Sequence, residues 1–167
     1  MTHIRDAIWS DRTTLACFNA AMARETEDRE LDAELLQAGV DAVLRDAGKG
    51  FYLMAERDGE SVGQLLITFE WSDWRNGVFW WIQSVYVHPE NRRQGVFRSL
   101  YEDVLRRAER AQNVCGLRLC VERGNAAAQA VYRRLGMGPT IYEMFELAVE
   151  PPFRKSASSQ TASPGAR

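Results

Sequence analysis

Three arginines surround one glycine where a strand-like stretch gives way to a helix-like one. The turn runs Arg92-Arg93-Gln94-Gly95-Val96-Phe97-Arg98, after the β-branched and aromatic residues 84–87, and Pro89 lies between. The first turn of a helix leaves backbone N–H groups unpaired at the positive end of its dipole, so it attracts phosphate. Gly95 has no Cβ, which lets a ligand approach the backbone closely. The turn predicts a phosphate-binding site; the alternative is an ordinary turn with solvated arginines.

A second set of residues could supply a proton. Asn125 and Tyr132 lie seven residues apart in a stretch that predicts a helix from Asn125 to Leu135, ended by Gly136. Two helical turns separate the two side chains, so they face the same side. A phenol with an ordinary pKa of about 10 stays protonated at neutral pH and can donate to a leaving group. Tyr132 can therefore donate a proton; the alternative is that it packs the helix onto a sheet.

Together the two motifs resemble those of the GNAT superfamily of acyl-CoA-dependent N-acyltransferases, over about residues 1–149. That family carries Arg/Gln-x-x-Gly-x-Gly/Ala at its pyrophosphate turn, and this chain has Arg92-Arg93-Gln94-Gly95-Val96-Phe97, with Phe97 in place of a small residue. The family also carries Asn-x-x-Ala-x-x-x-Tyr-x-x-x-Gly-Phe in a later helix. The matching residues here are Asn125, Ala128, Tyr132, Gly136 and Met137.

The resemblance implies an N-acetyltransferase that moves an acetyl group from acetyl-CoA to a primary amine, by direct attack in a ternary complex and without a metal. Backbone groups of residues 85–87 should bind the pantetheine arm and the thioester, and residues 92–98 the pyrophosphate. Tyr132 should lie near the sulfur and act as the general acid that protonates the leaving thiolate. The residues implied in cofactor binding are Val85, Tyr86, Val87, Arg92, Arg93, Gln94, Gly95, Val96, Phe97, Arg98, Asn125 and Tyr132. Acyl transfer to an amine also requires donors for the oxyanion and a proton acceptor.

The proton acceptor stays open at the level of sequence. Residues 78–87 include no acid, so the candidates are Glu25 and Glu27 in the acid-rich connection 24–30 and Glu70 at a predicted turn. Glu27 is also expected to bind the acceptor. The alternative for any one of these acids is a solvated acidic loop.

The stretch after Glu70 is rich in tryptophan. Trp71 and Trp74 follow it closely, and Trp80 and Trp81 lie in the next predicted strand. Some of these side chains belong to the core. An aromatic and acidic wall also suits an ammonium group, through cation–π attraction and charge pairing. We therefore expect a cationic small amine or a protein amine as the acceptor, bound by Glu27, Trp71, Trp74 and Trp81.

Composition sets further limits. The 167 residues are 46% apolar with a net charge of −2, which fits one domain over residues 1–150 and gives no basic surface for nucleic acid. No apolar run is long enough for a membrane span, and no signal-peptide pattern opens the chain, so we expect a cytoplasmic protein. Residues 151–167 predict a disordered tail.

The cysteines Cys17, Cys115 and Cys120 predict buried thiols rather than a disulfide or zinc site, and His3 and His88 lack metal-ligand spacing.

The predicted elements follow the order β-α-α-β-β-β-α-β-α-β. Asp58-Gly59 and Asn76-Gly77 predict hairpins, hence antiparallel strands. The helix after Gly95 connects two strands that should be parallel, with a right-handed crossover. Ile141 to Val149 should close the sheet. The expected fold is a GNAT-like three-layer α/β sandwich with a mixed, mostly antiparallel sheet and one central parallel pair.

Two other functions compete with the enzyme. A non-catalytic acyl-CoA-binding or regulatory module could use the same fold, although such a module would not need the Tyr132 hydroxyl. A nucleotide-triphosphate binder is disfavoured, because Val96 and Phe97 follow Gly95 where a P-loop has Lys-Ser/Thr. Because members of the family often pair, a homodimer is a further expectation.

Overall fold

The structure of the protein is a computed structural model that describes residues 1–149. These residues fall into two units, Met1–Glu122 and a second unit that begins at Arg123, and each is described by itself. The tail predicted over 151–167 lies outside the described residues. The prediction of a single domain over 1–150 stays a prediction.

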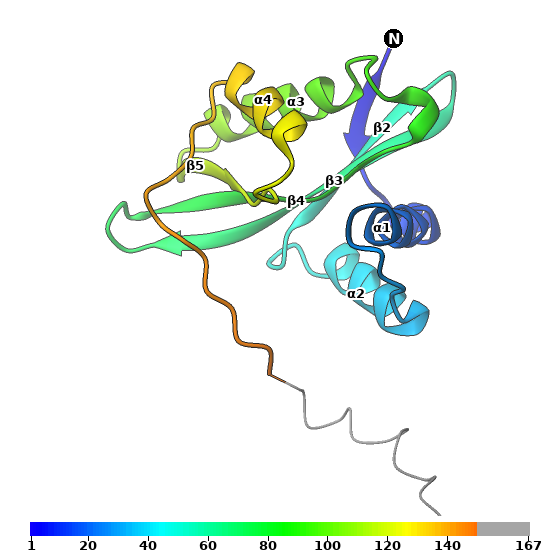
Figure 1. Ribbon diagram of the computed structural model, residues 1–167, viewed down its shortest axis with the longest axis horizontal. Helices are drawn as coiled ribbons and strands as arrows, with labels where there is room; N and C mark the ends of the chain where they lie inside the picture. The colour runs from blue at the N-terminus through cyan, green and yellow to red at the C-terminus, as the bar shows by residue number, and fades with distance from the viewer. Residues whose placement is uncertain (150–167) are drawn as a thin grey trace, which may run out of the picture. The chain divides into compact units, whose positions relative to one another are not determined.

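Within the described residues, the first unit contains a five-stranded sheet in the order β1-β2-β3-β4-β5 (Figure 1). Its strands are β1 (His3–Asp6), β2 (Phe51–Arg57), β3 (Glu60–Ser72), β4 (Gly77–Val87) and β5 (Val114–Leu119). Strands β1 to β4 pair antiparallel in sequence order, and β4 pairs with β5 in parallel. The predicted mixed α/β sheet is therefore confirmed.

The two hairpins follow from local backbone chemistry. Asp58 and Gly59 both have positive φ, 51° and 83°, as a two-residue hairpin turn requires. Asn76 also has a positive φ of 45°, at the turn before β4. The Asp-Gly and Asn-Gly predictions are confirmed, and these turns bring β2, β3 and β4 side by side.

Helices cover both faces of the sheet. Helices α1 (Arg12–Glu27) and α2 (Ala33–Arg45) lie on one face and α3 (Val96–Arg110) on the other (Figure 1). Short 3-10 turns, η1 (Trp9–Asp11) and η2 (Pro89–Asn91), precede α1 and follow β4. Asp32 caps α2 by accepting the Leu35 N–H at 2.8 Å. Helix α1 is longer than predicted, so Glu25 and Glu27 lie in its last turn and not in the connection.

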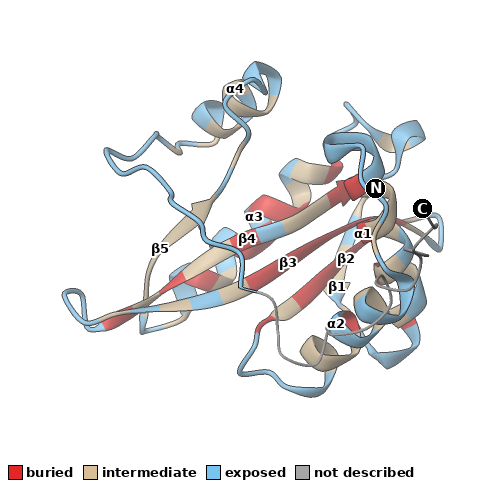
Figure 2. Cartoon of the chain, turned by 60° about the horizontal axis from the view of Figure 1, so that its bottom comes forward, coloured by how far each residue is buried: buried red, intermediate tan, exposed pale blue. Residues whose placement is uncertain are grey.

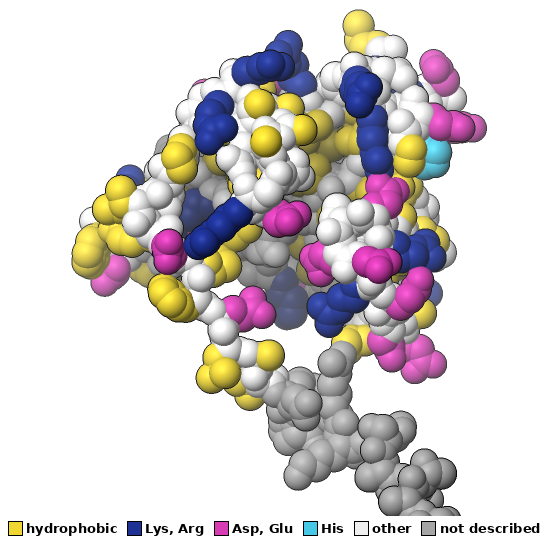
Figure 3. Space-filling view, in the orientation of Figure 1, with side chains coloured by type: hydrophobic (Ala, Val, Ile, Leu, Met, Phe, Trp, Pro, Cys, Tyr) yellow, Lys and Arg dark blue, Asp and Glu magenta, His cyan; other side chains and the backbone are white. Residues whose placement is uncertain are grey.

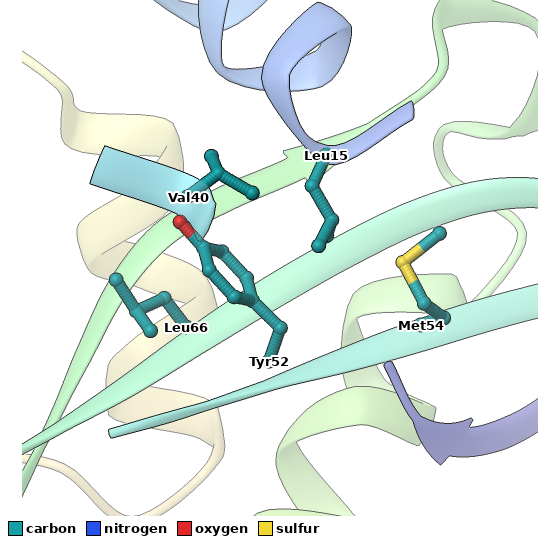
Figure 4. Packing of buried hydrophobic residues seen from close by; sticks show 5 residues of the cluster. All are labelled: Leu15, Val40, Tyr52, Met54 and Leu66. Carbon is teal, nitrogen blue, oxygen red and sulfur yellow. The ribbon is translucent and has the colours of Figure 1, made fainter. Parts of the chain in front are cut away.

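The core under α1 and α2 is built from Leu15 and Val40 on the helices and Tyr52, Met54 and Leu66 on the strands. In Figure 4, Tyr52 and Leu66 project from neighbouring strands toward the helical residues. Figure 2 shows continuous runs of buried residues in β2 and β3. These strands are buried on both faces, which explains their nearly continuous apolar sequences.

The opposite face of the sheet holds an aromatic group next to α3. The rings of Phe51 and Trp80 have centroids 5.2 Å apart, and Phe69 lies 6.2 Å from each. The guanidinium of Arg107, from α3, lies 5.9 Å from the Phe51 ring. Trp80 is therefore part of the packing against α3.

The sequence prediction of buried thiols is wrong. Cys17 and Cys120 are exposed and Cys115 is half-buried, so the thiols are not in the core. In α1 the buried residues Leu15, Asn19 and Ala23 recur every four positions, and Cys17 lies off that face.

The second unit contains α4 (Ala126–Arg134), and Gly136 ends it with a φ of 86°. The strand predicted over Ile141 to Val149 is wrong, since residues 141–149 form no strand. Ile141 and Phe145 are 92% and 90% exposed. An alternating apolar pattern becomes a strand only where a neighbour supplies backbone partners. The parallel pair β4–β5 consequently lies at an edge of the described sheet, not at its centre.

Candidate functional site

Strands β4 and β5 pair along only part of β4. The parallel register begins at Val78 and ends where Ile82 lies opposite Leu119. Residues 83–87 of β4 continue beyond that point, in register with β3 on the other side. The far edge of β4 thus lies outside the β4–β5 ladder over the residues predicted to hold the pantetheine arm.

A β-bulge interrupts β4 directly after this separation. One residue of β3, Leu65, lies opposite two residues of β4, Ser84 and Val85. Ser84 has a φ of 46°, a left-handed conformation that is unfavourable for a residue with a Cβ. Bulges of this kind re-aim the backbone and are frequent next to active sites. The bulge turns the local peptide groups of β4 out of the regular ladder.

The predicted phosphate turn lies at the start of a helix, as expected. Gly95 is the N-cap residue of α3, with a φ of 83°, and Val96 is the first helical residue. A Cβ placed on Gly95 would meet no atom within 4 Å, so the backbone there is open. Arg93 and Arg98 are exposed around it. A helix start with an open glycine and cationic neighbours fits a pyrophosphate, and this assignment stays a prediction.

Arg92 is held on the side of the turn that faces α1. Its Nε donates to the carbonyl oxygen of Val87 at 2.9 Å, and its guanidinium forms an ion pair with Glu25. The same guanidinium lies 5.8 Å from the ring of Tyr86. Arg92 therefore joins the end of β4 to the last turn of α1.

Gln94 is fixed from β2. Arg57 donates to the Gln94 side-chain oxygen and, at 2.8 Å, to its backbone oxygen. Phe97, the residue that departs from the family pattern, has its ring 6.3 Å from that of Tyr101. Its side chain is thus placed along α3, where it need not fill the space at Gly95.

Glu25 lies close to the bulged part of β4. The hydroxyl of Tyr86 donates to Glu25 at 3.4 Å, and the Tyr86 ring packs on Phe18 of α1 at 5.0 Å. Burial, with the nearby Glu25 charge, raises the pKa of Tyr86, so its phenol stays protonated at neutral pH. The structure brings Glu25, Tyr86 and Arg92 together, while Glu27 is exposed at the end of α1.

Glu70 belongs to a different group, farther from the bulge. Its two carboxylate oxygens accept from the Trp81 indole N–H and from Arg118 Nη1, the latter at 2.7 Å. Arg118 also lies 3.6 Å from the centroid of the Phe79 ring. Both oxygens of Glu70 are thus engaged, as are those of Glu25, so hydrogen bonding alone does not choose between these two acids as the base. The assignment of Glu70 as the base stays a prediction. The alternative is a structural role, in which Glu70 holds Trp81 and Arg118.

The tryptophans do not gather as one wall. Trp81 joins Glu70, but Trp71 projects from the opposite face of β3, because neighbouring residues in a strand alternate. Trp74 is 90% exposed in the turn between β3 and β4. The roles of Trp71 and Trp74 in acceptor binding remain predictions.

The sequence interpretation missed Arg118 and a buried polar pair, Asn19 and Gln64. Arg118 interrupts an apolar strand, and Gln64 interrupts the apolar run at residues 62–67, which are the signals that could have revealed them. Gln64 is fully buried and donates to Asn19 Oδ1 at 2.5 Å. Asn19, on α1, and Gln64, on β3, thus meet between the helix and the sheet, next to the bulge.

In the second unit, Asn125 caps α4, and its side-chain oxygen accepts the Ala128 N–H at 3.0 Å. Tyr132 follows on the same helix, and burial raises the pKa of its phenol. The hydroxyl therefore remains a proton donor at neutral pH. The contacts of Asn125 with pantetheine and of Tyr132 with the sulfur stay predictions.

Among the described residues there is no cluster of metal-ligating side chains and no helix fit to span a membrane. Over residues 1–149, no three His, Cys, Asp or Glu side chains gather as a metal site. Across the same residues, no helix is long and apolar enough to cross a membrane. On the face shown in Figure 3, basic and acidic side chains are interspersed.

Comparison with known proteins agrees with this geometry. The crystal structure of a "possible acetyltransferase" from Clostridium difficile 630 superimposes with a TM-score of 0.84 and 43% identity, over 90% of this chain and 99% of that one. A predicted acetyltransferase from Clostridium acetobutylicum, solved with acetyl-CoA, has the same fold at 19% identity, with a TM-score of 0.72, over 89% of this chain and 96% of that one.

Sequence comparison gives named relatives and a family. An L-methionine sulfoximine/L-methionine sulfone acetyltransferase from Pseudomonas paraeruginosa is 32% identical over 140 residues, 80% of this chain and 78% of the relative. The protein of the same name from Pseudomonas aeruginosa is 31% identical over 140 residues, with the same coverage of both chains. Residues 4–137 match the sequence model described as the acetyltransferase (GNAT) family. The chain therefore belongs to the GNAT family of acetyltransferases.

Proposed function

We propose that the protein transfers an acetyl group from acetyl-CoA to a primary amine by direct attack in a ternary complex. The observation that carries this proposal is the separation of β5 from β4 directly before the bulge at Ser84 and Val85. The open helix start at Gly95 follows a few residues after the end of β4. One strand thus offers backbone groups for a thioester arm and leads into a phosphate-binding turn. Acetyl-CoA supplies the activated thioester when it is bound.

The residues of β4 and of the turn would position the cofactor. The peptide groups of residues 85–87 would pair with the pantetheine arm, because β5 does not occupy that edge of β4. The N–H groups at the start of α3, with Arg93 and Arg98, would hold the pyrophosphate. By the resemblance to the family, Asn125 would bind the pantetheine arm and Tyr132 would act at the sulfur.

The proton transfers fall to side chains of this chain. As the amine nitrogen bonds to the thioester carbon, the carbon–sulfur bond breaks, the amine loses a proton and the thiolate gains one. Glu25 accepts a hydrogen bond from Tyr86, which follows the bulge directly, so we assign it the proton from the amine. Tyr132 would protonate the thiolate, since a thiol has an ordinary pKa of about 8.5 and its anion is a moderate leaving group.

The acceptor is a primary amine whose identity must be tested directly. The relatives from Pseudomonas are named for L-methionine sulfoximine and L-methionine sulfone, which carry an α-amino group beside a carboxylate. We propose a small amine of this kind as the first acceptor to test. A dicationic amine and a peptide amine, as the acidic residues Glu25 and Glu27 would favour, form the comparison set.

An acetyl-CoA-dependent thiol-release assay across this panel tests the function. We expect release that depends on one amine and yields its N-acetyl product by mass spectrometry. If acetyl-CoA binds but no amine in the panel leads to release of the CoA thiol, a non-catalytic acyl-CoA-binding module is favoured instead. A protein whose melting temperature is unchanged by millimolar acetyl-CoA would contradict both functions, because a ligand of the native state must stabilise it.

A further inference from the structure

We propose that Gln64, held by Asn19, is a positioning residue for acyl transfer, because it fixes the β4 bulge against which the thioester must be placed. This inference rests on the proposed function. It concerns two side chains that lie between α1 and the sheet, Asn19 from α1 and Gln64 from β3. Neither would itself touch a substrate.

The contacts form a short chain from α1 to the bulge. Gln64 Nε2 donates to Asn19 Oδ1 at 2.5 Å and to the backbone oxygen of Ser84 at 3.4 Å. Asn19 Nδ2 in turn donates to the Tyr52 hydroxyl at 3.3 Å. Gln64 is 0% exposed and Asn19 5%, so water does not compete for these bonds from bulk solvent. The Gln64 amide thus ties the bulge to α1, and the Asn19 amide ties α1 to β2.

The bulge needs such a contact. Ser84 is held at a φ of 46°, which its Cβ makes unfavourable, and one residue of β3 faces two of β4 there. Such a conformation persists only where surrounding contacts fix it. The Gln64 amide bonds to the carbonyl of the strained residue itself. Removing it frees the peptide between Ser84 and Val85 to relax toward an ordinary strand.

Stability alone does not explain a glutamine at this position. Its Oε1 atom is buried without a hydrogen-bond partner among the described residues. A buried acceptor in that state is destabilising, and an apolar side chain of similar volume would avoid the penalty. The amide is therefore better explained by what its Nε2 group holds than by a gain in stability.

The bulge lies where a misplaced peptide would affect the reaction. It begins two residues after the last register pair of β4 with β5, Ile82 with Leu119. Under the proposed function, backbone N–H groups next to this separation would donate to the thioester oxygen. Preorganised donors act on the charge that develops in the transition state, so a small displacement lowers turnover more than binding.

The test compares Gln64→Met with Tyr52→Phe. Methionine keeps the length of the side chain and removes the amide. The Tyr52→Phe variant also removes a buried hydrogen bond of Asn19, but one that leads away from the bulge, so it controls for general destabilisation. For Gln64→Met we expect kcat to fall at least about tenfold, with the acetyl-CoA Kd within about twofold of wild type. For Tyr52→Phe we expect kcat within about twofold of wild type.

A pH series with Gln64→Glu gives an independent measurement. A carboxyl group donates to the Ser84 oxygen only when protonated, so the kcat of this variant, relative to wild type, should fall as pH rises. The nearby titratable groups are the phenols of Tyr52 and Tyr86. Burial raises the pKa of both above the ordinary value of a phenol, so both stay neutral across a pH series around neutrality. This variant also serves if Gln64→Met does not fold.

The outcomes separate this inference from the proposed function. If wild type releases thiol and Gln64→Met keeps kcat within twofold, or Gln64→Glu follows the wild-type pH profile, the positioning role is refuted while the function stands. If Tyr52→Phe lowers kcat as much as Gln64→Met does, the effect is general destabilisation and the inference is likewise refuted. If wild type releases no thiol with any amine, the proposed function fails first.

Discussion

Replacing Glu25 with Gln should tighten acetyl-CoA binding, although it removes a candidate catalytic group. Arg92 is anchored to the Val87 carbonyl at 2.9 Å, directly before the phosphate turn, and its guanidinium pairs with Glu25. An incoming pyrophosphate must share that guanidinium with the carboxylate. Without the Glu25 charge, Arg92 is free to turn to the phosphate.

The size of the effect follows from the exposure of the pair. The side chains of Arg92 and Glu25 are 43% and 38% exposed, so solvent screens their attraction. Exposed ion pairs contribute about 0.2–1 kcal/mol. At about 1.4 kcal/mol per tenfold change, the acetyl-CoA Kd should fall by a factor of about 1.4 to 5. The gain should shrink as salt rises from 0.05 to about 0.5 M, because salt screens exposed charges.

Isothermal titration calorimetry of acetyl-CoA with Glu25→Gln, Arg92→Gln and the double variant measures this coupling. Glu30→Gln removes one exposed acid just beyond α1 and is the matched control, for which we expect a smaller change in Kd. In the Arg92→Gln background, Glu25→Gln should no longer tighten binding. An unchanged or higher Kd for Glu25→Gln alone, or the same gain in Glu30→Gln, would refute competition for Arg92.

Three further results are expected. Tyr132→Phe keeps the ring and removes the donor, so kcat should fall by about two to four orders of magnitude with acetyl-CoA affinity unchanged; wild-type turnover would assign Tyr132 to packing. Gly95→Glu places bulk and negative charge at a left-handed position of the phosphate turn, and acetyl-CoA binding measured by calorimetry should weaken at least about tenfold, whereas wild-type affinity would place the pyrophosphate elsewhere. Arg5, hydrogen-bonded to Asp11, holds the pKa of Asp11 below its ordinary value, so this pair stabilises the fold above that value and the contribution is lost as pH falls. Asp11→Asn should therefore lower the melting temperature at neutral pH, with a deficit that shrinks below about pH 4; a deficit that is constant across pH would contradict the linkage.

The parts of the fold that depend on neighbouring residues could be predicted from the sequence. The turn at Asp58 and Gly59 needs positive φ at adjacent positions, and the helix start at Gly95 needs an open backbone, so residue types alone indicate both. The closing strand failed for the opposite reason. Its alternating pattern is local, but strand formation depends on a partner strand that is distant in sequence. Residues 141–149 form no strand in the structure.

The site residues divide in the same way. Gln64 and Asn19 are 45 residues apart, and Arg118 and Glu70 are 48 apart, so no spacing rule pairs them. The bulge makes the site harder to predict from sequence, because one extra residue in β4 changes which side chains of that strand share a face. Hence Tyr86 lies under α1 beside Glu25, a proximity that an uninterrupted alternation from Trp81 would not give.

The engagement of Glu70 changes what the acceptor test must discriminate. A free carboxylate among tryptophans would favour a cation, but Glu70 is already neutralised by Arg118, and the guanidinium carries more N–H donors than the one that Glu70 accepts. That group therefore gives little net attraction for an ammonium. The remaining negative charge near the bulge is Glu25, which Arg92 offsets until a phosphate competes for it. A net cationic acceptor consequently has no strong electrostatic advantage over a zwitterion. A zwitterionic amino acid against a dicationic amine is thus the sharpest pair in the acceptor panel.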